Sequence, residues 1–186
     1  MDTSDFKNGI SLNLDGTIVT IVEFQHVKPG KGPAFVRSKL KNVRTGAVTE
    51  KTWRAGERME QAILDRVTAQ YLYSTGDEYV FMDQEDFEQF NLSADQIGSQ
   101  VKYLKDGMEV LVLRHGSGIL NVELPVAMEL EVIETDPGLR GDTASGGSKP
   151  AKVETGAVVQ VPLFINVGDR IKVDTRSDAY LERAKG

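Results

Sequence analysis

The chain has 186 residues, with 22 basic and 28 acidic side chains that give a formal net charge of −6. This charge excludes a uniformly basic nucleic-acid coat, and the absence of cysteine excludes disulfide scaffolds, thiolate metal sites and cysteine nucleophiles. No stretch approaches the roughly 18 apolar residues of a membrane span, and the acidic N-terminus is unlike a signal peptide, so we expect a cytoplasmic protein with no membrane partner.

The N-terminal third has the alternation that is typical of strands. Ile10, Leu12 and Leu14 alternate with polar residues before an Asp15-Gly16 hairpin signal. Strands are predicted over residues 17–27 and 34–43, on either side of a loop rich in proline and glycine, and strand-like residues continue over 62–73. A small twisted barrel of five or six strands fits this region.

Basic residues gather in the same third. Residues 28–58 contain nine basic and two acidic side chains, a net charge of +7 in an acidic chain. On the strand over residues 34–43, Arg37, Lys39 and Lys41 share one face because side chains alternate along a strand. The cluster predicts a partner with phosphates at one end of the chain, and the alternative is a solvated sheet edge.

The rest of the chain also consists mostly of strands. We predict strands over residues 79–82, 110–113, 119–122, 129–135, 157–162 and 171–175. Asp83 is expected to cap a short helix over residues 84–90, and Ser93 a turn at residues 95–97. A long loop is expected over residues 136–149, which are rich in Gly, Ser and Thr. The predicted fold class is therefore all-β.

A weak internal repeat suggests a duplicated domain. Residues 104–112 align with residues 165–173 at an offset of 61, sharing an apolar residue, a glycine and an alternating strand. This pattern suggests two copies of a five-stranded oligonucleotide-binding (OB) barrel. The predicted domains are residues 1–65, 66–128 and 129–186.

No catalytic constellation is present in the sequence. The acidic residues between 77 and 88 have no partner base, and no phosphate-binding or nucleophile motif occurs. His26 and His115 are 89 positions apart, without the spacing of metal ligands. We therefore expect a binding factor rather than an enzyme, with no cofactor and no metal.

Two motifs carry a resemblance to a known family. The hairpin reads His26-Val27-Lys28-Pro29-Gly30-Lys31-Gly32-Pro33-Ala34-Phe35. The C-terminal part fits K-x-A-x4-G-x2-[LIV]-x-V-P-x2-[LIV]-x2-G through Lys149, Ala151, Gly156, Val159, Val161, Pro162, Ile165 and Gly168. With both motifs in order, essentially the whole chain resembles bacterial translation elongation factor P.

The resemblance implies a fold and a function. It implies three small barrels, an SH3-like (KOW-type) barrel followed by two OB-fold barrels, with an elongated tRNA-like shape. It further implies a monomer that binds the ribosome between the peptidyl- and exit-tRNA sites and relieves stalls at consecutive prolines. The implied partners are the ribosomal RNA and proteins, the peptidyl-tRNA, the mRNA at the exit site and a lysine-modifying enzyme.

The resemblance also implies site residues. Lys31 is the loop-tip lysine that reaches the acceptor end of the peptidyl-tRNA and is enzymatically extended in many members. The supporting loop residues are Lys28, Pro29, Gly30, Gly32 and Pro33. The exit-site codon loop is Gly141-Asp142-Thr143, although Ala144 to Gly147 depart from the wording of some members. The predicted RNA-binding residues are Arg37, Lys39, Lys41 and Arg44, from the basic stretch over residues 28–58, and Tyr180 and Arg183, from the resemblance.

Three alternatives stay open. The first is a carrier domain with biotin or lipoate on a hairpin lysine, although Met-Lys-Met is absent. The second is a general binder of single-stranded RNA, although the basic stretch contains only Phe35 and Trp53 as stacking aromatics. The third is a specialised paralogue of elongation factor P.

Overall fold

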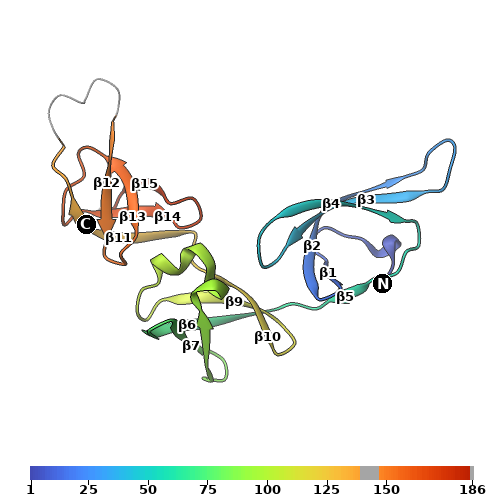
Figure 1. The fold of residues 1–186 in the computed structure, drawn as a ribbon, viewed down its shortest axis with the longest axis horizontal. Coiled ribbons are helices and arrows are strands. Elements are labelled where there is room, and N and C mark those ends of the chain that lie inside the picture. Colours follow the sequence, from blue (N-terminus) through green and yellow to red (C-terminus); the bar gives the residue numbers. More distant parts are fainter. Residues whose placement is uncertain (139–146, 185–186) are drawn as a thin grey trace. The chain divides into compact units, whose positions relative to one another are not determined.

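The computed structural model describes residues 1–138 and 147–184, which form three β-sheets with little helix (Figure 1). The predicted all-β class is therefore confirmed. The N-terminal sheet follows the 3-10 helix η1 (Thr3–Asp5) and has the strand order β4-β3-β2-β1-β5. Its strands are β1 (Ser11–Leu14), β2 (Thr17–Val27), β3 (Phe35–Asn42), β4 (Val48–Arg54) and β5 (Glu60–Ala62).

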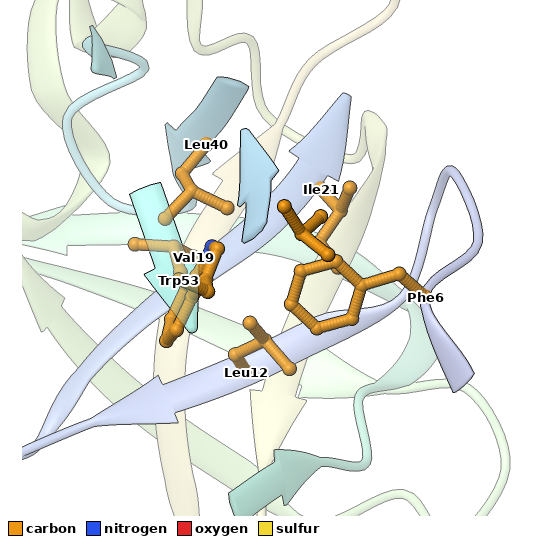
Figure 2. Packing of buried hydrophobic residues seen from close by; sticks show 7 residues of the cluster. Phe6, Leu12, Val19, Ile21, Leu40 and Trp53 are labelled. Atoms are coloured by element: carbon orange, nitrogen blue, oxygen red, sulfur yellow. The ribbon is translucent and has the colours of Figure 1, made fainter. Parts of the chain in front are cut away.

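One apolar cluster forms the core beneath this sheet (Figure 2). The Phe6 ring meets the Trp53 ring edge to face, with centroids 5.6 Å apart. The Trp53 Nε1–H donates to Ser38 Oγ at 2.8 Å, so the buried indole has an acceptor. The buried members of the cluster are Phe6, Leu12, Val19, Ile21, Val36, Leu40 and Trp53.

The β2–β3 hairpin extends beyond this core and ends in the loop over residues 28–34 (Figure 1). Ile21 lies opposite Leu40, but the next pair is Glu23 with Lys39, so Val22 is the extra residue of a β-bulge. Beyond the bulge Phe24 is on the core side, where its ring centroid lies 6.1 Å from that of Phe6. The core therefore packs against the part of the hairpin that is farther from the loop, as far as Phe24.

The middle sheet has the strand order β10-β9-β6-β7-β8. Its strands are β6 (Asp65–Thr75), β7 (Glu78–Asp83), β8 (Gln89–Ser93), β9 (Glu109–His115) and β10 (Gly118–Glu123), and β8 leads into the helices α1 (Ala94–Ile97) and η2 (Gly98–Tyr103). The predicted Ser93 cap is confirmed, because its Oγ accepts from the Gln96 N–H at the start of α1.

The helix predicted over residues 84–90 is wrong. Asp83 does accept a backbone N–H, that of Glu85 at 2.8 Å, but it does so in a tight turn. Phe87 adopts a φ of 62°, which ends any right-handed helical path. The chain then reverses into β8, and the N–H of Asp83 bonds to the carbonyl of Glu88 across the new hairpin.

The C-terminal sheet is a closed barrel with the strand order β11-β12-β13-β15-β14. Its strands are β11 (Ala127–Thr135), β12 (Ser148–Val153), β13 (Val158–Pro162), β14 (Arg170–Asp174) and β15 (Ala179–Arg183). The predicted loop over residues 136–149 ends earlier than expected, because β12 already begins at Ser148.

The sequence repeat corresponds to a repeated structural unit. Gly107 and Gly168 both have positive φ, 81° and 91°. The N–H of Gly107 donates to the carbonyl of Tyr71, and that of Gly168 to the carbonyl of Val132, both at 2.8 Å. The two acceptors are themselves 61 residues apart, so the glycine turn and the strand that accepts its hydrogen bond recur at the same offset in both sheets.

Candidate nucleic-acid interface

Lys31 lies at the exposed tip of the β2–β3 hairpin. Its flanking glycines differ. Gly32 has a φ of 107°, a conformation that side chains rarely adopt, whereas a Cβ at Gly30 would meet nothing within 4 Å. Pro29 is half-buried, and Lys28 and Pro33 are exposed. Among the described residues Lys31 has no ion pair, so its ammonium is available to a ligand.

The outer face of β3 carries the predicted cations. At the two ends of the β3–β4 ladder, Ala55 N–H donates to Ala34 O and Asn42 N–H donates to Ala47 O. Hydrogen-bonded and non-hydrogen-bonded residue pairs alternate along an antiparallel ladder. The pairs whose side chains point away from the core are therefore the non-hydrogen-bonded pairs, in which the side chains lie closest together. These outward pairs are Phe35 with Arg54, Arg37 with Thr52, Lys39 with Glu50, and Lys41 with Val48. The predicted shared face of Arg37, Lys39 and Lys41 is confirmed.

The charge on this outer face is not uniform. Lys39 Nζ lies 2.8 Å from Glu23 Oε2, and Glu50 is its partner on β4. The hydrogen bond that Lys39 donates to the Glu23 carboxylate raises the pKa of Lys39, which keeps the ammonium charged and paired with that carboxylate. Arg37 instead has Gln25 and Thr52 as its cross-strand neighbours. Glu23 and Glu50 therefore neutralise the middle of the basic face at Lys39, so that Arg37 and Lys41 lie on either side of this acidic pair.

Sequence reasoning missed Arg54 as a member of this face. Arg54 is exposed, lies opposite Phe35 and is diagonal to Arg37, at the end of the sheet nearest the Lys31 loop. Neither Arg37 nor Arg54 has a salt bridge to any residue that the structure describes. The Thr45-Gly46 turn, which sets the register of β3 against β4, was the signal that could have placed Arg54 here.

Other residues of the basic stretch lie elsewhere. Arg44 is exposed in the turn after β3, away from the Lys31 loop. Lys51 is on the core-side face of β4, where its Nζ lies 4.4 Å from the Trp53 ring centroid. Because Trp53 is buried, it is not the stacking surface considered from the sequence, and Phe35 is the aromatic residue on the outer face of β3.

In the C-terminal barrel, the structure brings Tyr180 and Arg183 to one face of β15. A regular strand would place residues three apart on opposite faces. Here Tyr180 pairs with Val173 and Arg183 with Ile171, and the register shift between them leaves Leu181 as an extra residue. Tyr180 is half-buried and Arg183 is exposed. The predicted loop Gly141-Asp142-Thr143 lies outside the described residues.

The described part of the chain offers no group of three or more metal-ligating side chains. Within the same residues, no helix is long and apolar enough to cross a membrane.

Comparisons with known proteins cover nearly the whole chain. Three family models match it: the elongation factor P KOW-like domain over residues 2–59, the elongation factor P OB domain over residues 64–122, and elongation factor P, C-terminal, over residues 128–183. Proteins named elongation factor P from a Synechococcus strain and from Acaryochloris marina are each 59% identical over 183 residues, which cover 98% of this chain and 99% of theirs.

Solved structures give a shorter match. Eukaryotic translation initiation factor 5A from Methanococcus jannaschii is 27% identical, with a TM-score of 0.52, and the match covers 66% of this chain and 92% of that one. A translation initiation factor 5A family protein from Naegleria fowleri is 20% identical, with a TM-score of 0.54 over 67% of this chain and 96% of that one, a likeness of fold alone.

Proposed function

The chain belongs to the elongation factor P family of translation elongation factors, and we propose that it binds the ribosome between the peptidyl- and exit-tRNA sites and relieves stalls at consecutive prolines. The observation that carries this proposal is the exposed Lys31, without an ion pair among the described residues, at the tip of a hairpin anchored in a packed core. In this proposal residues 1–65, 66–128 and 129–186 act as three domains, a division that the ranges of the three family models support.

The proposed mechanism is positional. Proline is a poor nucleophile in peptide transfer, because its amine is secondary and its ring restricts the approach to the ester. A factor that holds the acceptor end of the peptidyl-tRNA in a reactive arrangement lowers the entropic part of the barrier without supplying an acid or base. An extended lysine reaches about 6–7 Å from its Cα, so Lys31 acts where the loop places it. A group added to Lys31 by a modifying enzyme would lengthen this reach.

The outer face of β3 is the proposed surface for the RNA backbone. Arg37 and Arg54 lie nearest the loop and make no salt bridge among the described residues, so their guanidinium groups are available for phosphate oxygens. Phe35, opposite Arg54, adds a half-buried ring between them and the loop. Lys41 and Arg44 extend the surface away from the loop. Lys39 contributes least, because Glu23 already occupies its ammonium.

The C-terminal barrel supplies the remaining proposed contacts. Tyr180 and Arg183, on one face of β15, contact tRNA, and Gly141-Asp142-Thr143 approaches the codon at the exit site. Replacing Asp142 and Thr143 with alanine should reduce stall relief and leave the melting temperature unchanged. A large fall in melting temperature would instead mark this segment as structural.

The direct test of the proposed function is translation in vitro of a message with a proline run, with and without this protein. Full-length product should increase only for the proline message, and a matched message without the run should be unaffected. Filter binding to unstructured RNA distinguishes the alternative of a general RNA binder. Tight binding there, together with no effect on the proline message, would contradict the proposal.

A further inference from the structure

A polar junction links the middle sheet to the C-terminal barrel. Residues 67–111 and 122–186 form one compact unit, and the junction lies within it. Asp178, in the turn between β14 and β15, accepts two hydrogen bonds from η2. Tyr103 Oη donates to Asp178 Oδ1 at 2.7 Å, and Lys102 Nζ donates to Oδ2 at 2.6 Å. One carboxylate therefore satisfies two donors of the neighbouring sheet.

The Tyr103 hydroxyl requires a hydrogen-bond acceptor at this contact. The Tyr103 side chain is fully buried and is among the largest such side chains in the described residues. A buried tyrosine hydroxyl needs a hydrogen-bond partner, and here Asp178 provides it from the other sheet. Burial, followed by the bond to Asp178, raises the pKa of Tyr103, so the phenol remains a donor. The Lys102 ammonium lowers the pKa of Asp178, which keeps the carboxylate ionised.

The backbone of Asp178 adopts a conformation that few residue types favour. Its φ is 58°, in the left-handed region, which glycine visits most readily and asparagine and aspartate visit occasionally. Glycine would adopt this conformation without steric cost but would leave Tyr103 and Lys102 without their acceptor.

A second set of contacts holds the barrel at other points. Thr175, in the same turn as Asp178, donates to the carbonyl of Pro125 at 2.8 Å and accepts from Gln100 Nε2 at 3.3 Å. Lys105 Nζ lies 2.9 Å from Glu154 Oε2, in the turn after β12. Two different turns of the barrel therefore contact this part of the chain.

The strand β15 begins directly after Asp178 and carries Tyr180 and Arg183. We propose that Asp178 and Tyr103 are positioning residues that fix the β14–β15 turn against η2 and thereby place Tyr180 and Arg183 for RNA contact. This inference rests on the proposed function, because Asp178 and Tyr103 affect ribosome binding only if Tyr180 and Arg183 contact RNA.

The test is ribosome binding by Asp178→Gly, with Glu182→Gln as the matched control. Both changes remove one negative charge, which by itself favours RNA binding. Glu182 is exposed on β15, which follows Asp178, and its carboxylate lies 3.4 Å from Lys172 Nζ. We expect Asp178→Gly to weaken binding by roughly two- to thirtyfold, the range found for residues that act on a ligand from a distance. Glu182→Gln should bind at least as tightly as the parent.

A double-mutant cycle separates positioning from general destabilisation. In a chain that already contains Arg183→Ala, Asp178→Gly should cause a smaller loss than it causes in the parent, because one of the two residues through which it acts is absent. Equal affinity of Asp178→Gly and the parent would overturn the inference, and so would additive losses in the cycle or an Arg183→Ala variant that binds like the parent. In each of these cases the parent can still relieve proline stalls, so the proposed function fails only by its own test.

Two milder variants keep the test decisive if Asp178→Gly does not fold. Asn tolerates the left-handed conformation and its amide oxygen still accepts from Tyr103, so Asp178→Asn removes the negative charge and the second oxygen, which accepts from Lys102. Tyr103→Phe removes only the hydroxyl. Each should weaken ribosome binding less than complete loss of the junction, and Asp178→Asn should also show weaker coupling to Arg183→Ala. Parent-like binding by both variants would contradict the inference.

Discussion

Changing Glu23 and Lys39 together to Gln deletes the ion pair on the outer face while the net charge stays at −6. Because Lys39 Nζ is held 2.8 Å from Glu23 Oε2, with Glu50 as its other cross-strand neighbour, we expect no phosphate at Lys39 in the ribosome complex. The double variant should therefore bind ribosomes with the affinity and the salt dependence of the parent. The side chains of Lys39 and Glu23 are 45% and 65% exposed, so little fold stability depends on the pair.

Two single variants, Arg37→Gln and Glu23→Gln, show how much one phosphate contact changes the salt dependence of ribosome binding. Each phosphate contact changes the slope of log affinity against log salt by about 0.7–0.9, which corresponds to about threefold in affinity between 50 and 200 mM salt. Arg37→Gln should make the slope shallower by one such step. Glu23→Gln should make it steeper by one step, because it releases Lys39 to a phosphate.

The assay is ribosome binding measured at four or more salt concentrations for the parent and the three variants. A double variant whose slope falls as far as that of Arg37→Gln would show that Lys39 already contacts a phosphate. An unchanged slope in Glu23→Gln would show that releasing this ammonium does not add a contact. Either result would refute the division of the basic face at Lys39.

Ser38→Ala should lower the free energy of unfolding by roughly 1–3 kcal/mol in urea titrations, because the buried Trp53 Nε1–H loses its acceptor, and wild-type stability would contradict the assigned bond. Gly32→Ala should impair stall relief more than Gly30→Ala, because only Gly32 has a positive φ, and equal activity would show that this conformation is not needed. Since the folded-state pKa of Asp178 lies below its ordinary value of 3.8, its stabilising contribution is present above that pH and is lost as the pH falls through the folded-state pKa. Acid titrations should therefore show a smaller loss of stability below pH 4 in Asp178→Asn than in the parent, and parallel curves would exclude this contribution.

The sequence was sufficient where one residue pattern has one structural meaning. The period of two over residues 34–43 predicted the faces of β3 correctly, and the repeated glycine turn predicted the duplicated unit. Asp83 shows the limit of such patterns. An aspartate that caps a helix and one that caps a tight turn offer the same oxygen to a backbone N–H, and the positive φ of Phe87 decided between them.

What could not be predicted depends on register and on contacts distant in sequence. The bulge at Leu181 places Tyr180 and Arg183 on one face, against the alternation that their spacing indicates. The junction between Tyr103 and Asp178 joins residues 75 positions apart, with no local pattern to connect them. The role of Lys31 and the RNA contacts stay predictions.

The most direct test of the central claim is stall relief by Lys31→Ala, with Lys7→Ala as the control. Both substitutions remove an exposed lysine from the N-terminal part of the chain, and neither should change fold stability by more than about 0.5 kcal/mol. Translation in vitro of a message with a proline run should then collapse to the level without factor for Lys31→Ala and should match the parent for Lys7→Ala. If Lys31→Ala relieves the stall as efficiently as the parent, the hairpin loop does not have the role proposed for it.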